Sequence, residues 1–330
     1  MKNLRWFYFI GFCFLLVSTV QARTYKIGVV PWAGWSPMHV ADAKGFWKEQ
    51  GVDVEVINYY DSTKILSDVR KKRIDIGFDM VGTIVGFYMR GVSLTVIAET
   101  DWSHGGDKII IKKGLHVQQF KGRPFGVYLN KPSVTFFLNK YLSTMGMRIS
   151  DARVIQLDPD RLADKFIAGL FNVIVLYDPH ALHAAQKGNG EVIATSATYE
   201  GCIPEGMYMR PDVLAQMPAQ DLEKIFKGWI KAVQWMKKPS NWRKFKDILN
   251  NRTFKGDTPY SDEALKEMMN GVRIHEVSKQ LERNRDGGGL HQYLKELNTF
   301  LIDNKKFKKE FKPEEIFNNK VIVKVLESIK

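Results

Sequence analysis

The fold is decided by residues 25–59, which read YKIGVVPWAGWSPMHVADAKGFWKEQGVDVEVINY. The β-branched run Tyr25–Val30 predicts a strand that stops before a proline. Pro37–Lys48 predicts a helix, and Val52–Tyr59 alternates apolar and polar residues as a second strand does. A strand, a helix and a strand in this order predict two parallel strands with the helix on one face of the sheet.

The same alternation continues outward from this unit in two rounds. Further strands are predicted at Ile74–Phe78, Leu94–Ala98, Lys108–Lys112, Pro124–Tyr128, Ala152–Leu157, Val173–Tyr177 and Val192–Thr195. Helices are predicted at Ser62–Lys71, Val81–Arg90, Val134–Met145, Ala163–Ala168 and Pro179–Gln186. From Pro211 onward the pattern is helical almost throughout. We therefore expect an α/β fold of two lobes, each a mostly parallel sheet flanked by helices, with a helical C-terminal extension.

The chain is expected to pass between the two lobes twice, near Asp101–Gly106 and near Thr198–Pro204. This assigns residues 23–102 and 204–330 to lobe 1 and residues 103–203 to lobe 2. Two lobes joined by a pair of crossing segments predict a cleft and a hinge.

Residues 1–22 have the three parts of a secretory signal peptide. Lys2 and Arg5 precede the apolar run Trp6–Val17, and Val20-Gln21-Ala22 supplies small residues for cleavage after Ala22. The alternative is an uncleaved anchor, but this run is shorter than the roughly 20 residues that span a bilayer. We expect export to the periplasm.

The composition is that of an ordinary folded protein. Its 330 residues are 45% hydrophobic and 26% charged, and Cys13 and Cys202 are its two cysteines. This excludes a disordered chain and a disulfide scaffold. The net charge is +13, but residues 221–330 interleave 24 Lys and Arg with 16 Asp and Glu, as a solvated helical face does. The charge therefore does not indicate a nucleic-acid partner.

Aromatic and polar side chains follow several of the predicted strands. In open α/β sheets, ligands bind outside the carboxyl ends of the strands, where helix N-termini also point. The candidate ligand-binding residues at these ends are Trp32, Trp35, Ser36, Asp79, Met80, Thr83, Asp101, Trp102, Ser133, Thr135, Tyr177 and Asp178. Each has a structural alternative: the tryptophans can cover the core, and the Asp, Ser and Thr side chains can cap helices.

Signatures of catalysis are absent from the sequence. It contains no G-x-S-x-G, no H-E-x-x-H and no Gly-rich phosphate loop. His180 and His183 lie on one face of a predicted helix, but no third metal ligand accompanies them. We expect no enzyme activity, no cofactor and no metal.

Several motifs, in order along the chain, carry a family resemblance. Gly45-Phe46-Trp47, Arg73-Ile74-Asp75-Ile76-Gly77, Phe120-Lys121-Gly122-Arg123 and Tyr177-Asp178-Pro179-His180 are found here with the spacing of ABC-transporter substrate-binding proteins. The resemblance is to the nitrate, sulfonate, taurine and thiamine-precursor group and covers about residues 25–215. Lys131-Pro132-Ser133 departs from it, because that group often has a Gly-Thr turn there.

The resemblance implies a type II periplasmic binding fold, a small-molecule ligand and, as partners, ABC permease subunits with their ATPase. A monomer is expected. Two alternatives stay open: a periplasmic sensing subunit for a membrane receptor, and a biosynthetic enzyme on the same fold.

The charge of the candidate residues favours a nitrogen-bearing ligand. Asp79, Asp101 and Asp178 accompany aromatic rings, whereas Lys131 is the one cation among these loops. Carboxylates and aromatic faces bind cations and N–H groups. An amine-bearing or nitrogen-heterocyclic solute is therefore preferred to nitrate or a plain sulfonate, and taurine lies between the two.

Overall fold

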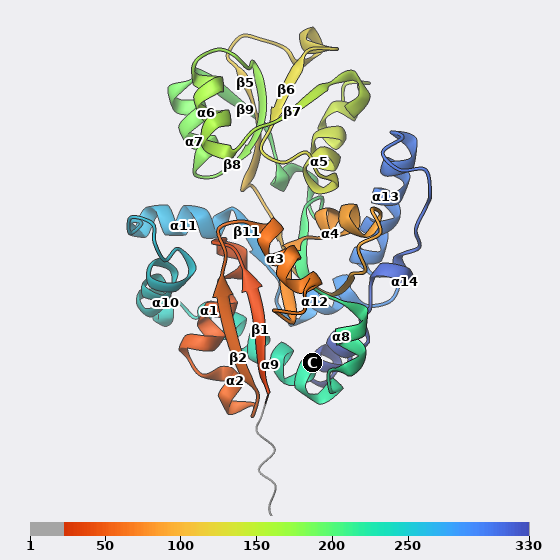
Figure 1. The fold of residues 1–330 in the computed structure, drawn as a ribbon. Coiled ribbons are helices and arrows are strands. Elements are labelled where there is room, and N and C mark those ends of the chain that lie inside the picture. Colours follow the sequence, from red (N-terminus) through yellow and green to blue (C-terminus); the bar gives the residue numbers. More distant parts are fainter. Residues whose placement is uncertain (1–22, 330) are drawn as a thin grey trace, which may run out of the picture.

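The computed structural model describes residues 23–329, which form two lobes stacked along one axis (Figure 1). The predicted signal peptide lies outside the described residues. One lobe is built on a six-stranded sheet and the other on a five-stranded sheet, and helices flank both. This is the two-lobed α/β architecture that the sequence predicts. Within residues 23–329, no helix is both long enough and apolar enough to cross a bilayer.

The six-stranded sheet has the order β11-β4-β10-β3-β1-β2. Its strands are β1 (Thr24–Val29), β2 (Asp53–Asn58), β3 (Ile76–Met80), β4 (Thr95–Ser103), β10 (Pro204–Met209) and β11 (Val272–Ile274). β1 runs parallel to β2 and β3, whereas β10 runs antiparallel to β3 and β4.

The five-stranded sheet has the order β7-β6-β8-β5-β9. Its strands are β5 (Asp107–Lys112), β6 (Pro124–Val127), β7 (Arg153–Gln156), β8 (Val173–Tyr177) and β9 (Gly190–Thr195). β6 is parallel to β7 and β8, and β5 is antiparallel to β8 and β9.

Helices connect and cover these strands. In the first two-thirds of the chain they are α1 (Ser36–Ala43), α2 (Phe46–Glu49), α3 (Ser62–Arg70), α4 (Val81–Tyr88), α5 (Pro132–Ser143), α6 (Pro159–Ile167) and α7 (His180–Lys187). The C-terminal third adds α8 (Pro211–Gln216), α9 (Ala219–Met236), α10 (Trp242–Ile248), α11 (Asp262–Asn270), α12 (Val277–Asn284), α13 (Gly289–Asp303), α14 (Pro313–Ile316) and α15 (Lys320–Ile329).

Three details differ from the expectation. Both sheets are mixed rather than mostly parallel, because the chain leaves one lobe on β4 and returns to it on the antiparallel β10. The helix expected at Pro37–Lys48 is two helices, since Gly45 takes a left-handed conformation with φ of 69° between them. Two strands, β10 and the short β11 in the helical C-terminal third, were not predicted from the sequence.

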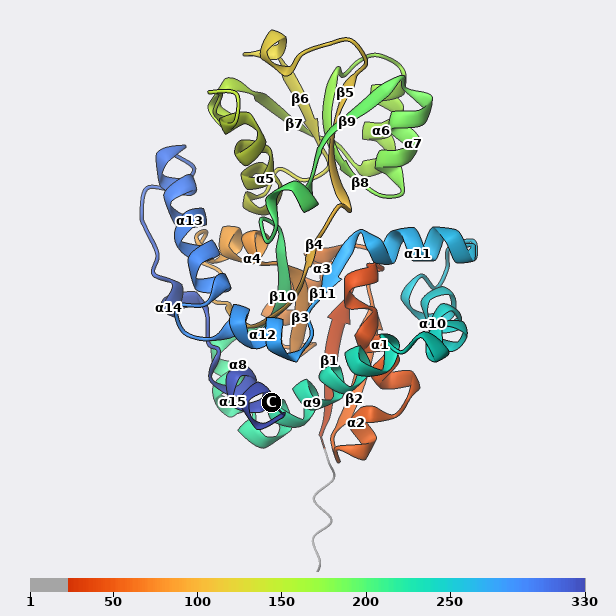
Figure 2. The same ribbon diagram turned by 180° about the vertical axis from the view of Figure 1, so that it is seen from behind.

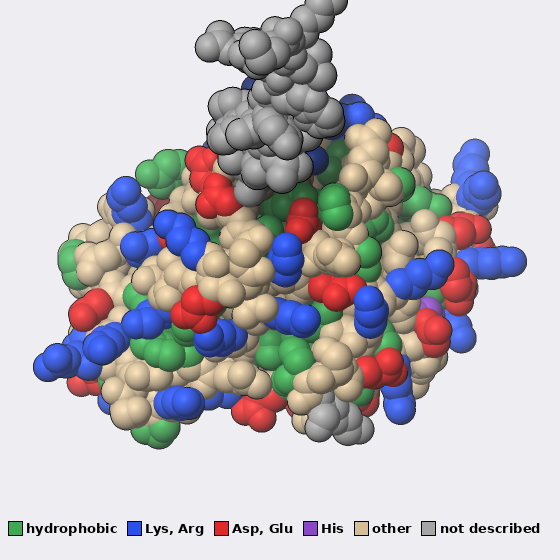
Figure 3. Space-filling view, turned by 90° about the horizontal axis from the view of Figure 1, so that it is seen from below, with side chains coloured by type: hydrophobic (Ala, Val, Ile, Leu, Met, Phe, Trp, Pro, Cys, Tyr) green, Lys and Arg blue, Asp and Glu red, His purple; other side chains and the backbone are tan. Residues whose placement is uncertain are grey.

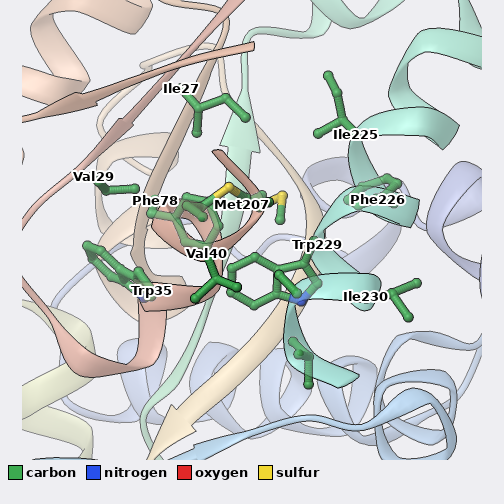
Figure 4. Packing of buried hydrophobic residues seen from close by; sticks show 14 of the residues in the cluster. Ile27, Val29, Trp35, Val40, Phe78, Met207, Ile225, Phe226, Trp229 and Ile230 are labelled. Atoms are coloured by element: carbon green, nitrogen blue, oxygen red, sulfur yellow. The ribbon is translucent and has the colours of Figure 1, made fainter. Parts of the chain in front are cut away.

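The C-terminal helices of the chain complete the core of the first lobe. Trp229 on α9 is fully buried, and its ring lies 5.6 Å from that of Phe78 on β3. Figure 4 shows these rings with Met207 of β10 and Val40 of α1 in one cluster. Truncating a buried ring of this size costs about 3–5 kcal/mol, so α9 is an integral part of the lobe.

Two segments pass between the lobes side by side, seen from behind in Figure 2. β4 runs to Ser103, five residues beyond the predicted strand end, and all nine of its residues are buried. β10 pairs with it along the way, from Pro204 opposite Trp102 to Met209 opposite Thr95. The two crossing segments are therefore paired antiparallel strands where they leave the first lobe.

Candidate functional site

Three aromatic rings meet between the lobes. Trp32, which follows β1, meets the ring of Tyr177 edge to face at 6.2 Å between centroids. Tyr177, at the end of β8, in turn lies 4.8 Å from the ring of Tyr128, which follows β6. All three side chains are half-buried. The rings therefore come from strand ends of both sheets, as the predicted sites do.

Acidic side chains lie beside these rings. The Tyr128 hydroxyl donates a hydrogen bond of 2.6 Å to Asp107, and the Trp32 indole N–H donates one of 2.5 Å to Glu205. Glu205 is opposite Asp101 in the β10–β4 pairing. Burial, together with the neighbouring Asp101, holds the pKa of Glu205 well above its usual range. The site is acidic and aromatic in character.

Asp79 lies at the end of β3, 3% exposed, and accepts a hydrogen bond of 2.8 Å from the Met80 amide. Burial raises the pKa of Asp79 to about 7, and the hydrogen bonds from Met80 and Ser62 offset only part of that effect. Because this pKa is higher in the folded than in the unfolded protein, the free energy of unfolding depends on pH. The contribution of Asp79 to stability is fully present below about pH 4 and is lost as the pH rises to about 7.

We expect Asp79→Asn to raise the melting temperature of the ligand-free protein. Asparagine keeps an acceptor for Met80 without an ionisable group, so the gain should be near zero at about pH 4 and grow until about pH 7. Thermal unfolding across this range measures it. The exposed Asp164→Asn is the control, and a gain independent of pH contradicts the prediction.

Asp178 is a paired carboxylate, although its Oδ1 is buried without a hydrogen bond from residues 23–329. It pairs with Lys108, whose ammonium also donates to the Gly105 carbonyl at 2.7 Å. Burial raises the pKa of Asp178 despite this partner. The pair holds the start of β5 against the loop that follows β8, and the charge of Asp178 is balanced within the protein.

A second set of predicted residues forms the contact between α4 and α5. The Thr83 and Ser133 hydroxyls share a hydrogen bond of 2.9 Å across the lobes. Thr135 donates to the Lys131 carbonyl at 3.0 Å, in the first turn of α5. Lys131 lies over the ring of Phe87 at 5.1 Å from its centroid. These side chains are engaged with one another, next to Asp79 and Met80.

Three predicted residues lie elsewhere. Trp35 is 4% exposed, with its ring 5.5 Å from Phe78, inside the cluster of Figure 4. Ser36 is fully buried and donates to the Ala33 carbonyl at 2.7 Å, so it closes a turn. Trp102 is 3% exposed, lies within β4 and packs against the ring of His275. The turn after β1 exposes one indole, not two, because its second tryptophan points into the core.

Asp101 differs from the expectation in another way. The sequence places it in a loop where it could cap a helix, but it lies inside β4 and is fully buried. Burial raises its pKa to about 7, and hydrogen bonds from Glu205 and Thr100 offset only part of that effect.

The site also contains three residues that were not among the candidates predicted from the sequence: Glu205, Asp107 and Tyr128. Glu205 belongs to the returning strand, and Asp107 ends a Gly-rich turn, so neither follows a strand of the predicted parallel set. The sequence did contain an indication of their role, because Asp107 and Glu205 each directly follow one of the two predicted crossings between the lobes.

Metal-binding geometry is not found in the described part of the chain. No group of three or more His, Cys, Asp or Glu side chains in residues 23–329 is arranged to hold an ion.

The architecture is that of periplasmic solute-binding proteins of ABC importers, and solved structures of that class share it. The aliphatic sulphonate binding protein SsuA of Escherichia coli superimposes with a TM-score of 0.70 at 12% identity, covering 90% of this chain and 92% of SsuA. The nitrate-binding protein NrtA of Synechocystis PCC 6803 does so with a TM-score of 0.69 at 13% identity, covering 94% and 90%. At these identities the likeness establishes the fold.

The chain belongs to the NMT1-like family, whose sequence model matches residues 18–250. This confirms the resemblance drawn from its motifs. The protein YtlA of Bacillus subtilis (strain 168) is 23% identical over 219 residues, covering 62% of this chain. The match spans 64% of YtlA, less than two-thirds of its length.

Proposed function

We propose that this protein is the solute-binding component of an ABC importer, and that it captures an amine-bearing or nitrogen-heterocyclic solute between its two lobes. The acidic and aromatic character of the interlobe site carries the proposal. Trp32 and Glu205 come from the six-stranded sheet, and Tyr177, Tyr128 and Asp107 come from the five-stranded sheet. The solved relatives named above are binding proteins, which favours capture over catalysis.

The charges around the site favour a nitrogen-bearing solute over an anion. Lys108 is paired with Asp178, and Lys131 lies over Phe87, on the α4–α5 side. Lys108 also acts on Asp107, but its charge is already paired with that of Asp178, so the acids around Trp32 carry the excess charge of the site. A cationic or N–H-rich group gains charge-assisted hydrogen bonds there, and its flat body gains contact with the rings.

In the proposed arrangement, lobe 1 comprises residues 23–102 and 204–330, and lobe 2 comprises residues 103–203. The hinge lies in the paired crossing of β4 and β10. The 6.2 Å contact between the rings of Trp32 and Tyr177 belongs to the closed arrangement: the lobes part to admit the solute and return to this contact around it, and the closed form docks on the permease. On the face in Figure 3, basic side chains are interspersed with acidic ones, which favours a solvated face over a nucleic-acid site there.

The solute class is tested by calorimetry with an aminomethyl-substituted aminopyrimidine, its hydroxymethyl counterpart, taurine, nitrate and an alkane sulfonate. We expect the pyrimidines to bind and nitrate not to bind. Glu205→Gln or Trp32→Leu should weaken binding by about tenfold or more, as expected for losing one charge-assisted hydrogen bond or one aromatic contact. Trp242→Leu, on α10 away from the site, is the matched control. Tight binding of nitrate that neither variant weakens would refute the proposed ligand class.

Export is tested separately. The charged start and short apolar run of residues 1–22 favour cleavage after Ala22. Intact-mass spectrometry of the periplasmic fraction should show a chain that begins at Arg23. Recovery of only the full-length chain, in the membrane fraction, contradicts this.

A further inference from the structure

Two carboxyl groups meet on the crossing strands. Asp101 of β4 and Glu205 of β10 are register partners, 0% and 3% exposed, and their side chains hydrogen-bond to each other. A hydrogen bond between two carboxyl groups requires a proton, because two carboxylates offer only acceptors. Two negative charges in contact inside a protein are also strongly disfavoured.

Apart from the hydrogen bond between them, each of the two carboxyl groups receives one further hydrogen bond. The Trp32 indole N–H donates to Glu205 Oε2 at 2.5 Å, and the Thr100 hydroxyl donates to Asp101 Oδ1 at 2.7 Å. Asp101 Oδ2 is buried and receives no hydrogen bond from an N–H group or an alcohol hydroxyl of the described residues, so the proton shared with Glu205 is the hydrogen that can satisfy it. It lies over Gly34, where a Cβ would stand 2.1 Å from Oδ2 and 2.8 Å from the indole nitrogen of Trp32. The glycine leaves the two atoms room to converge.

No positive charge of the described protein offsets this pair. The ionisable groups on the elements packed around it are each engaged elsewhere or are themselves acidic: Glu99 with Arg283 and His275, Asp107 with Tyr128, Arg273 with His104, Lys108 with Asp178, and Asp79 with the Met80 amide. A cation for this site has to come from a ligand.

We propose that Asp101 and Glu205 share one proton in the ligand-free protein and release it to solvent when the positively charged nitrogen of an organic monocation binds at Asp101 Oδ2. The charges balance: a singly protonated pair carries one negative charge, and the doubly ionised pair with the bound monocation also carries one. The proposal rests on the proposed function, since it concerns the same site.

The protonation of the pair agrees with this exchange. Burial raises the pKa of Asp101 to about 7 and, with the proximity of Asp101, holds that of Glu205 well above its usual range. The pair therefore retains a proton near neutral pH. Affinity for a monocation should rise about tenfold per pH unit while the exchanged proton is bound, and level off where the free pair loses it.

The test is calorimetry of the aminomethyl-substituted aminopyrimidine at about pH 7.5, where its ring is neutral and its ammonium group carries the single positive charge, in buffers that differ in ionisation enthalpy. We expect about one proton released per bound ligand, and no release with the neutral hydroxymethyl counterpart. Asp101→Asn and Glu205→Gln should each abolish the release, whereas the exposed Glu327→Gln on α15 should leave it intact. Binding of the ammonium compound without proton release overturns the proposal and leaves the proposed function standing.

If neither pyrimidine binds, that result counts against the proposed function, and the shared proton is then tested by a measurement that needs no ligand. The infrared difference spectrum between the ligand-free protein and Glu205→Gln should contain the C=O stretch of a protonated carboxyl group. The spectrum against Glu327→Gln should lack it. Presence of the band supports the shared proton, and its absence overturns it.

Discussion

Arg283→Ala is expected to lower the free energy of unfolding by about 3–5 kcal/mol, the cost of leaving a buried charge without its partner. Glu99 of β4 has a fully buried side chain and receives two hydrogen bonds from the Arg283 guanidinium, at 2.7 and 3.0 Å. His275 approaches the same carboxylate at 2.9 Å, and Asn284 pairs with both main-chain groups of Glu99. The C-terminal α12 therefore holds the crossing strand.

The pH dependence of the loss in stability separates the loss of the Arg283–Glu99 charge interaction from the loss of packing between Arg283 and Trp102. Burial alone would raise the pKa of Glu99, but Arg283 and His275 outweigh it and hold that pKa below its usual value. A carboxyl group whose pKa is lower in the folded than in the unfolded protein stabilises the fold above its unfolded-state pKa, near pH 4. This stabilisation is lost as the pH falls through its folded-state pKa. The deficit of Arg283→Ala in urea unfolding should thus be large at about pH 7 and shrink at about pH 4.

Arg285→Ala, an exposed neighbour, is the control and should change stability by less than about 0.5 kcal/mol. Arg283→Lys should fall between the two, because an ammonium keeps the charge but not the paired geometry. An equal deficit for Arg283→Ala at both pH values would show that packing, not charge, is what the arginine supplies.

Strand and helix periodicity predicted the architecture well. The units from Tyr25 to Val127 alternate strongly, and their order along the chain sufficed for two α/β lobes. The prediction erred where a strand carries polar residues: Glu99–Ser103 reads as a loop, yet it continues β4 because the paired β10 and the side chain of Asn284 satisfy its backbone. Such pairing partners are distant in sequence, so no local pattern reveals them.

The candidate site was harder to predict, for a related reason. A residue after a strand can point toward the other lobe or into the core of its own, and Trp32 and Trp35 do one each. A short helical turn, Ala33–Trp35, sets this difference, and the sequence spacing does not fix its orientation. Glu205 becomes visible as a site residue only when the register of β10 brings it opposite Asp101.

Gly82→Leu is expected to hold the lobes apart and weaken solute binding, because Gly82 on α4 lies against the start of α5. A Cβ at this position would stand 2.7 Å from the Ser133 amide nitrogen and 2.7 Å from the Tyr293 hydroxyl. A backbone nitrogen cannot move aside as a side chain can, so the lobes have to separate. Overpacking of this kind costs about 1–3 kcal/mol, which converts to roughly 5- to 150-fold weaker binding if it opposes closure alone.

The prediction isolates the interlobe contact, because leucine is a better helix former than glycine and should not weaken α4 itself. Solution scattering with the aminomethyl-substituted aminopyrimidine should show a decrease in the radius of gyration for the parent protein and little or none for Gly82→Leu. Ala215→Leu, exposed on α8, should behave as the parent does. If Gly82→Leu binds with parental affinity and contracts normally, the contact between Gly82 and Ser133 is not part of the closed form, and closure has to proceed through the Trp32 and Tyr177 side alone.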